Sequence, residues 1–237
     1  MQGPRKGRLQ YLAFALALAA AGLLVLVLLI SRDSSGGEAT PSPQESDIRR
    51  TEALLAGIPQ HGAALGDPKA PVTLQFFGDL QCGQSRQAML GAIPFLIRHW
   101  VRAGKLRIVY RSLETDTPER SIFLQQQIAA LAAGQQGKMW TFIQLFYRAE
   151  QPELAAYGPF IREIAEQAGV RLAPWAKARK VDGWAREVES DEDLAETREM
   201  GVSPSFLIGP TGGAAHRLRH FSLEEPGVYD EAIGELL

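Results

Sequence analysis

The stretch "PVTLQFFGDLQCGQSR" (residues 71–86) contains a strand pattern that leads through a turn into a helix. Its first seven residues are mostly β-branched, aromatic or aliphatic, which favours a strand, and apolar side chains at helical spacing follow over residues 89–101. Cys82, the only cysteine of the chain, lies at the turn between them. Gly104 is expected to end the helix, and "LRIVYRSL" (residues 106–113) predicts a second strand. Together these segments predict one βαβ unit whose two strands are parallel neighbours.

The rest of the domain is expected to contain a helical insertion, a strand pair and a last helix. A Thr-Pro start signal opens residues 118–200, where apolar positions recur at helical spacing. Residues 204–209 and 216–221 have strand patterns and are separated by the turn "PTGG", which predicts an antiparallel hairpin. A short helix is expected over about residues 226–236. This order of elements predicts an α/β architecture.

The N-terminal part predicts a membrane anchor. Residues 11–30 are uncharged and overwhelmingly apolar, and a helix of that length covers the ~30 Å hydrocarbon layer of a bilayer. Three basic side chains precede it, so residues 1–10 are expected in the cytoplasm and everything after the span outside it. A cleaved signal peptide is the alternative. Its apolar region would be shorter and would end at a small-residue cleavage site, so the pattern favours an uncleaved anchor.

A tether is expected between this anchor and the folded domain. Residues 31–46 are rich in Ser, Gly, Pro and Glu and have no apolar periodicity, which is typical of a flexible linker. The domain itself is expected over residues 47–237, close to the outer surface of the cell membrane.

Composition narrows the possible functions. The chain has 25 basic and 27 acidic residues and a net charge of -2, so no nucleic-acid partner is expected. One cysteine forbids an internal disulfide and any zinc site with two or more thiolates. His216 and His220 share one side of the expected strand, but no third ligand of a suitable type accompanies them. Neither a metal nor another cofactor is predicted.

The placement of Cys82 favours a reactive thiol. Unpaired N–H groups and the positive end of the dipole at a helix start stabilise the thiolate form of a cysteine. The alternative is that Cys82 is a small apolar residue of the core. A side chain at the start of a helix is expected to be partly exposed, so its position favours the reactive role.

Three features together resemble the DsbA-like branch of the thioredoxin fold, in particular its membrane-anchored bacterial members. They are the cysteine after "FFGDLQ", the helical insertion and the segment "GVSPSFLIG" (residues 201–209). The similarity extends from about Leu55 to the C-terminus. It implies a thioredoxin-like fold with a helical insertion, here preceded by one transmembrane helix.

The resemblance also implies a site that combines a cysteine turn with a cis-proline loop. Cys82 corresponds to the attacking cysteine, and Ser85 stands where the family has its second cysteine. The backbone of the loop is expected to pair with an extended substrate segment. The other implied site residues are those of the active-site turn and of the substrate-binding loop: Gly83, Gln84, Val202, Ser203 and Pro204.

Two departures from the family pattern bear on the chemistry. Ser85 cannot attack a mixed disulfide, so a substrate bound to Cys82 cannot be released from within the chain. Ser85 is otherwise interpreted as a polar residue of the first helical turn. Phe76 stands six residues before the cysteine, where many relatives have a buried acid that moves a proton. Asp79 is interpreted as structural.

These observations predict a monothiol thiol–disulfide exchange protein of oxidoreductase or isomerase type, acting on extracytoplasmic polypeptides that contain cysteines. A small-molecule or protein thiol is the expected resolving partner. Two other functions remain open. One is a non-catalytic module that binds extended polypeptide, as a chaperone would. The other is a redox sensor whose thiol is capped by a small thiol or oxidised to sulfenic acid.

Overall fold

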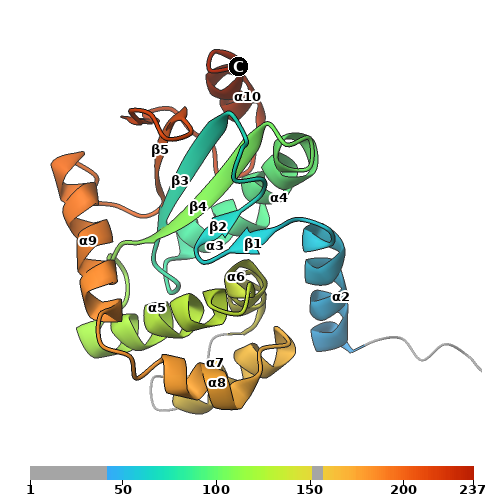
Figure 1. The fold of residues 1–237 in the computed structure, drawn as a ribbon, viewed down its shortest axis with the longest axis vertical. Helices are drawn as coiled ribbons and strands as arrows, with labels where there is room; N and C mark the ends of the chain where they lie inside the picture. The colour runs from blue at the N-terminus through green and yellow to red at the C-terminus, as the bar shows by residue number, and fades with distance from the viewer. Residues whose placement is uncertain (1–41, 151–156) are drawn as a thin grey trace, which may run out of the picture. The chain divides into compact units, whose positions relative to one another are not determined.

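A six-stranded sheet forms the centre of the fold in the computed structural model, which describes residues 42–150 and 157–237. The strand order is β1-β2-β4-β3-β5-β6. Helices lie on both sides of the sheet (Figure 1). The strands are β1 (Gln60–His61), β2 (Ala64–Leu65), β3 (Val72–Gly78), β4 (Leu106–Ser112), β5 (Ser205–Pro210) and β6 (His216–Arg217).

The strand pairing confirms the predicted βαβ unit and hairpin. β3 and β4 are parallel, with Val72 opposite Leu106. β5 runs antiparallel to β3, and β6 runs antiparallel to β5. β6 is shorter than predicted, and β1 and β2 were not predicted at all. Strands of two residues are too short to show an alternating pattern, so these two are recognised only by their pairing, of β1 with β2 and of β2 with β4.

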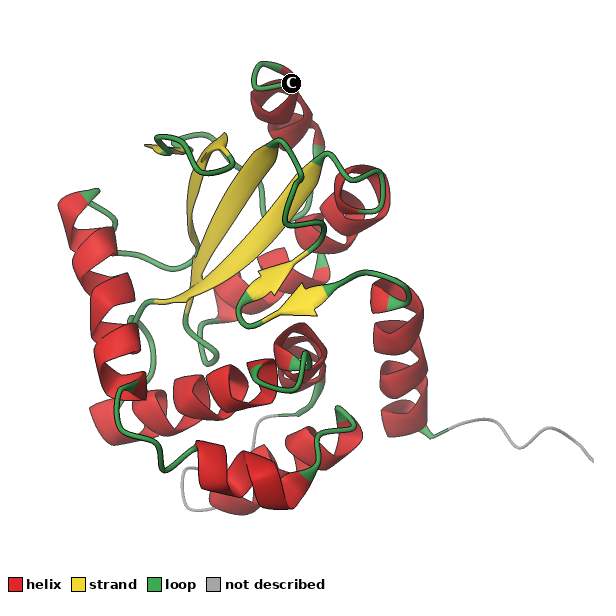
Figure 2. Cartoon of the chain, in the orientation of Figure 1, coloured by secondary structure: helices red, strands yellow, loops and turns green. Residues whose placement is uncertain are grey.

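The helices of the described residues are drawn in red in Figure 2, where the C-terminal helix lies at the opposite end of the domain from the helices of the insertion. They are α2 (Pro43–Leu55), α3 (Gly83–Leu90), α4 (Ala92–Leu96), the π-helix η1 (Ile97–Val101), α5 (Arg120–Gly134), α6 (Met139–Arg148), α7 (Tyr157–Gln167), α8 (Leu172–Ala178), α9 (Trp184–Thr197) and α10 (Gly227–Gly234).

The helix expected after Cys82 is broken at Gly91. The N–H of Ala92 donates to the carbonyl oxygen of Leu223 at 3.0 Å, so the backbone turns to a partner outside the helix. A Cβ on Gly91 would lie 2.6 Å from that same oxygen, so only glycine fits this close approach. Pro94 also lacks the N–H that a continuous helix would use. Gly104 ends the segment with a φ of +67°, as predicted.

The insertion is helical, as predicted, and α6 is its core. Every residue of α6 from Met139 to Tyr147 is buried, which includes the aromatic side chains of Trp140, Phe142, Phe146 and Tyr147. The indole N–H of Trp140 donates to the carbonyl oxygen of Ala63 at 2.9 Å. This bond ties α6 to the β1–β2 hairpin and so holds the insertion against the sheet.

The start of the domain differs from the prediction. α2 begins at Pro43, whereas the tether was expected to extend to residue 46. Proline is compatible with the first turn of a helix, and Thr51 and Leu54 are buried by packing, so tertiary contacts favour a helix where composition favoured a linker. Residues 1–41, which contain the predicted span and most of the tether, lie outside the described residues. Within residues 42–150 and 157–237, no helix has both the length and the apolarity needed to cross a bilayer.

Candidate functional site

Cys82 is the N-cap residue of α3, as the sequence predicted. Its backbone is extended, with φ -70° and ψ 121°, and its carbonyl oxygen accepts the N–H of Arg86 at 2.9 Å. Its own N–H donates to the carbonyl oxygen of Asp79 at 3.1 Å. Gly83 and Gln84 follow as the first residues of α3 and are exposed. The strand β3 and the turn after it therefore place the Cys82 sulfur at the start of α3.

The thiol of Cys82 is buried, which corrects the expectation of partial exposure. Only 3% of the residue is accessible to solvent. The Sγ atom donates a hydrogen bond to the carbonyl oxygen of Ser203 at 3.2 Å. The loop that contains Ser203, far along the chain, covers the start of α3. Local sequence patterns do not predict such a long-range contact, so the burial could not be expected from them.

That loop has the predicted cis peptide bond between Ser203 and Pro204. Both residues are buried, whereas 59% of Val202 is exposed beside them. The hydroxyl of Ser205 donates to the carbonyl oxygen of Val202 at 2.6 Å, which holds the turn into β5. The structure therefore brings the predicted loop residues and Cys82 together in one place, with Val202 as the exposed apolar side chain.

Asp79 connects this loop to the cysteine turn and has the structural role that the sequence suggested. It is fully buried, and its carboxylate accepts four backbone N–H groups at 2.9–3.0 Å and the Thr117 hydroxyl at 2.5 Å. The hydroxyl of Thr115 lies 2.6 Å from that of Ser203. Sequence reasoning missed Thr115 and Thr117. The four backbone donors belong to Gln81, Thr115, Asp116 and Thr117.

Ser85 lies in the first turn of α3 but does not act as a capping residue. It is fully buried, and its hydroxyl has no hydrogen-bond partner among the described residues. Positions three apart on a helix share a face, so Ser85 and Cys82 belong to the same side of α3. The alcohol occupies the resolving position of the turn without supplying a sulfur nucleophile.

Phe76, six residues before Cys82, packs in an aromatic cluster. Phe76 is fully buried, stacks on Tyr110 with ring centroids 5.8 Å apart, and meets Phe206 edge-on at 5.3 Å. A Cβ on Gly78 would lie only 2.4 Å from the Phe76 ring, so that ring is pressed against the end of β3. The position expected to carry an acid in many relatives is therefore an apolar, aromatic one here.

Two tyrosine hydroxyls donate hydrogen bonds to the backbone just before the cysteine turn. The hydroxyl of Tyr110 donates to the carbonyl oxygen of Gly78, and that of Tyr147 to the carbonyl oxygen of Asp79, each at 2.9 Å. Burial raises the pKa of Tyr147 well above its usual value, and the neighbouring Tyr110, Asp79 and Cys82 raise it further. Burial also raises the pKa of Tyr110. Both phenols therefore remain protonated donors at neutral pH, and they position the backbone before Cys82.

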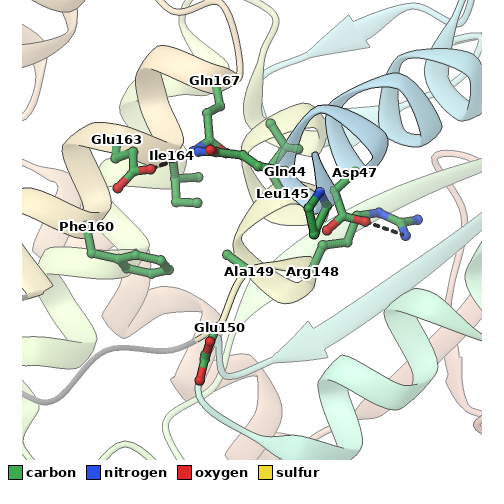
Figure 3. Close-up of a pocket in the computed structure, with 11 residues that line it drawn as sticks. Gln44, Asp47, Leu145, Arg148, Ala149, Glu150, Phe160, Glu163, Ile164 and Gln167 are labelled. Carbon is green, nitrogen blue, oxygen red and sulfur yellow. Dashed lines mark hydrogen bonds and ion pairs between the residues drawn. The ribbon is translucent and has the colours of Figure 1, made fainter. Parts of the chain in front are cut away.

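Other parts of the described chain do not extend this site. A cavity of about 430 Å³ lies between α2, α6 and α7 (Figure 3), and none of the predicted site residues is among its described lining. No group of three or more His, Cys, Asp or Glu side chains within residues 42–150 and 157–237 is arranged to hold a metal ion. The chemistry that the site residues offer is that of one thiol.

Comparisons with known proteins agree with this geometry. A family model described as Thioredoxin matches residues 60–216. No curated protein sequence matches the chain. The solved structure of alpha-DsbA1 from Wolbachia pipientis is similar with a TM-score of 0.61 at 17% identity, over 78% of this chain and 94% of that one.

Two further structures have the same fold. BdbD from Bacillus subtilis is similar with a TM-score of 0.61 at 16% identity, over 77% of this chain and 97% of that one. A thioredoxin-like oxidoreductase from Silicibacter pomeroyi DSS-3 is similar with a TM-score of 0.59 at 22% identity, over 78% of this chain and 95% of that one. These similarities establish the fold.

Proposed function

Because this chain belongs to the thioredoxin family, we propose that it is a membrane-anchored, extracytoplasmic thiol–disulfide exchange protein that works through the single thiol of Cys82. The main support for the proposal is the contact between the Cys82 sulfur and the cis-proline loop. Cys82 is the N-cap of α3, and its sulfur hydrogen-bonds to Ser203 of that loop. Two solved structures with this fold are those of the thioredoxin-like oxidoreductase from Silicibacter pomeroyi and of the thiol-disulfide exchange protein alpha-DsbA2 from Wolbachia pipientis.

The exchange step uses Cys82 as the nucleophile. Its thiolate attacks one sulfur of a substrate disulfide, a Cys82–substrate S–S bond forms, and the other substrate sulfur leaves as a thiolate. A second thiol, from solution or from the substrate itself, then attacks the mixed disulfide and returns Cys82 to the reduced state. Ser85 takes no part in this second attack because an alcohol does not resolve a mixed disulfide.

The geometry around Cys82 sets two conditions for this step. The hydrogen bond from Sγ to the Ser203 carbonyl oxygen must break, and the loop must move enough to admit a second sulfur. The freed carbonyl can then accept a backbone N–H from an extended substrate segment. We therefore expect substrate binding along the loop and access to Cys82 to occur together.

Membrane anchoring is part of the proposal and rests on the sequence. The apolar stretch over residues 11–30, with basic side chains before it, supports a single span with the domain outside the cytoplasm. An extracytoplasmic compartment is also where protein disulfides form and persist, so it would contain the proposed substrates.

A non-catalytic polypeptide-binding module is the second candidate. Two observations favour it: the burial of Cys82, and the 59% exposure of Val202 beside the cis-proline loop. An exposed apolar side chain next to a backbone that can pair with a strand is suited to an extended peptide. In this case the thiol would help to pack the loop and would not react.

Incubation of the full-length protein with glutathione disulfide tests the two candidates. The exchange proposal expects a one-to-one glutathione adduct in the intact mass, its absence in Cys82→Ser, and its removal by added dithiothreitol. The protein should not oxidise a dithiol peptide catalytically by itself. If Cys82 stays unmodified at pH 7 to 8 while the folded protein binds unfolded polypeptide, the exchange proposal fails and the binding module replaces it.

A further inference from the structure

Three arginines from separate helices line one cavity away from Cys82. They are Arg50 on α2, Arg98 on η1 and Arg148 at the end of α6. The cavity has a volume of about 460 Å³, which is within the range of small-molecule sites. Its described lining contains no acidic side chain. The rest of that lining is mostly apolar: Ala53, Leu54, Leu90, Gly91 and Pro94.

Arg148 is the least solvated of the three. Its side chain is 15% exposed, and its Nε–H is buried without a hydrogen-bond partner among the described residues. Among the residues that the structure describes, the guanidinium makes a long contact of 3.4 Å to the Gln144 side chain and an ion pair of 4.0 Å to Asp47. A buried donor without an acceptor costs free energy, so this guanidinium has unused capacity to bind an oxyanion.

Positive charge exceeds negative charge around the cavity. Asp47 forms ion pairs with two of the arginines, at 3.6 Å from Arg50 and 4.0 Å from Arg148 (Figure 3 shows Asp47 facing Arg148). Arg98 forms no ion pair with any residue that the structure describes. Asp47 therefore contacts two of the three guanidinium groups, and both contacts are longer than a direct charge-assisted hydrogen bond.

The electrostatics of Arg148 reflect the same arrangement. Burial lowers its pKa, Asp47 acts in the opposite direction, and Arg50 and Arg98 lower the pKa further by repulsion. Arginine nevertheless remains charged at neutral pH. Three like charges that line one cavity repel one another, and an anion bound between them would offset that repulsion.

We propose that this cavity is a binding site for a phosphate group, held by Arg50, Arg98 and Arg148. A tetrahedral phosphate offers oxygens in several directions, so it can accept hydrogen bonds from three guanidinium groups that approach from different helices, including bidentate pairs. A planar carboxylate with two oxygens matches three donors less well. The apolar residues Leu54, Leu90 and Pro94 provide a surface for an organic substituent on the phosphate.

This proposal is independent of the reaction of Cys82. The lining residues of the cavity include none of the predicted site residues among those described, so the two sites can be tested separately. The phosphate could come from free phosphate or from the head group of an anionic phospholipid. Both sources present phosphate oxygens, and a phosphodiester probe, which is a monoanion with two non-bridging oxygens, separates the lipid head group from free phosphate.

Isothermal titration of the full-length protein in neutral detergent tests the site. The probes are inorganic phosphate and glycerophosphoglycerol, the phosphodiester head group of phosphatidylglycerol, each at constant ionic strength with chloride as the background anion. We expect one saturable site. Binding of inorganic phosphate alone identifies free phosphate as the source, and binding of the diester identifies the lipid head group.

Four variants separate the proposed site from general charge effects. Arg98→Gln, at an exposed position, and Arg148→Gln should each weaken binding by roughly tenfold or more. Asp47→Asn should strengthen binding several-fold, because it removes the competing carboxylate. Arg162→Gln, on α7 and paired with Glu166 at 3.3 Å, removes the same charge elsewhere and should leave affinity unchanged.

The proposal is overturned if neither probe binds saturably, or if Arg98→Gln and Asp47→Asn bind as the wild type does. Circular dichroism of each variant shows whether its fold is retained. Arg98 makes no described hydrogen bond or ion pair, so Arg98→Gln keeps the test decisive even if Arg148→Gln unfolds.

Discussion

The thiol of Cys82 donates a hydrogen bond of 3.2 Å to the carbonyl oxygen of Ser203, which is 121 positions further along the chain. The hydroxyl of Ser203 lies 2.6 Å from that of Thr115, and the N–H of Thr115 donates to the carboxylate of Asp79 at 3.0 Å. Asp79 in turn accepts the N–H of Cys82 at its carbonyl oxygen. The site is thus a closed ring of polar contacts, and changes at any member should alter access to the sulfur.

Replacing Ser85 by cysteine should allow an internal disulfide with Cys82. Ser85 and Cys82 are three residues apart in one helical turn, within the range that a disulfide can bridge. The buried Ser85 hydroxyl has no described partner, so a less polar thiol suits its surroundings. After mild oxidation, we expect Ser85→Cys to lose two hydrogen atoms in the intact mass and both free thiols. Ser85→Ala is the control, and a variant that only accumulates a glutathione adduct would contradict the bridging geometry.

Asp79→Asn should destabilise the domain and expose the thiol. The carboxylate accepts five hydrogen bonds, and an amide would turn donor hydrogens toward buried N–H groups. We expect the free energy of unfolding to fall by about 3 kcal/mol or more. Urea denaturation measures this loss, and the rate of Cys82 alkylation in the native protein should rise as the Ser203 loop loosens.

Asp67→Asn is the matched control for that experiment. Asp67 is exposed, and its carboxylate accepts one backbone hydrogen bond, from Lys69 at 2.8 Å. Its substitution should cost less than about 1 kcal/mol. Equal losses for the two variants would show that the buried carboxylate of Asp79 does not hold the site together.

Gly91→Ala should destabilise the break between α3 and α4. The added Cβ would lie 2.6 Å from the Leu223 carbonyl oxygen and 2.8 Å from that of Gln87, and both contacts involve backbone atoms that cannot rotate away. We expect a loss of about 1–3 kcal/mol in thermal or urea unfolding. Gly234→Ala on α10 meets nothing within 4 Å and should be neutral or stabilising by up to about 1 kcal/mol. The prediction is wrong if Gly91→Ala is as stable as Gly234→Ala.

The domain is expected to remain in the membrane fraction of untreated cells. Protease added outside spheroplasts should digest it. The basic residues before the apolar stretch over residues 11–30, and the lack of a convincing cleavage site after it, are the reasons. Immunoblotting of fractions before and after digestion measures both properties. A soluble, shortened form in the medium would indicate cleavage, and resistance of intact spheroplasts to the protease would place the domain inside the cytoplasm.

Much of the fold could be predicted because the relevant information is local. The β-branched run before Gly78, the helical spacing after Cys82 and the strand at residues 106–113 each carry their own period, and a βαβ connection makes the two strands parallel neighbours. The helical insertion and the hairpin after Pro204 follow from the same kind of pattern. The cis bond at Pro204 came from the family resemblance, because no local period encodes it.

Other features depend on contacts between distant parts of the chain. Composition favoured a linker where burial of Thr51 and Leu54 makes a helix, and Gly91 ends α3 because the backbone of Leu223 approaches it. The arginine cavity gathers side chains from three helices.

The thiol of Cys82 also has some properties that the sequence determines and others that only the tertiary structure determines. The sequence by itself determined that Cys82 is the sole sulfur nucleophile, that it starts a helix, and that Ser85 cannot resolve its disulfides. Only the tertiary structure decided that the sulfur is buried. Ser203 covers it with its carbonyl oxygen, and the Ser203 hydroxyl is held by Thr115, whose N–H donates to Asp79. Periodicity reports which face of an element is buried, whereas hydrogen bonds across a hundred residues form only once the elements have packed.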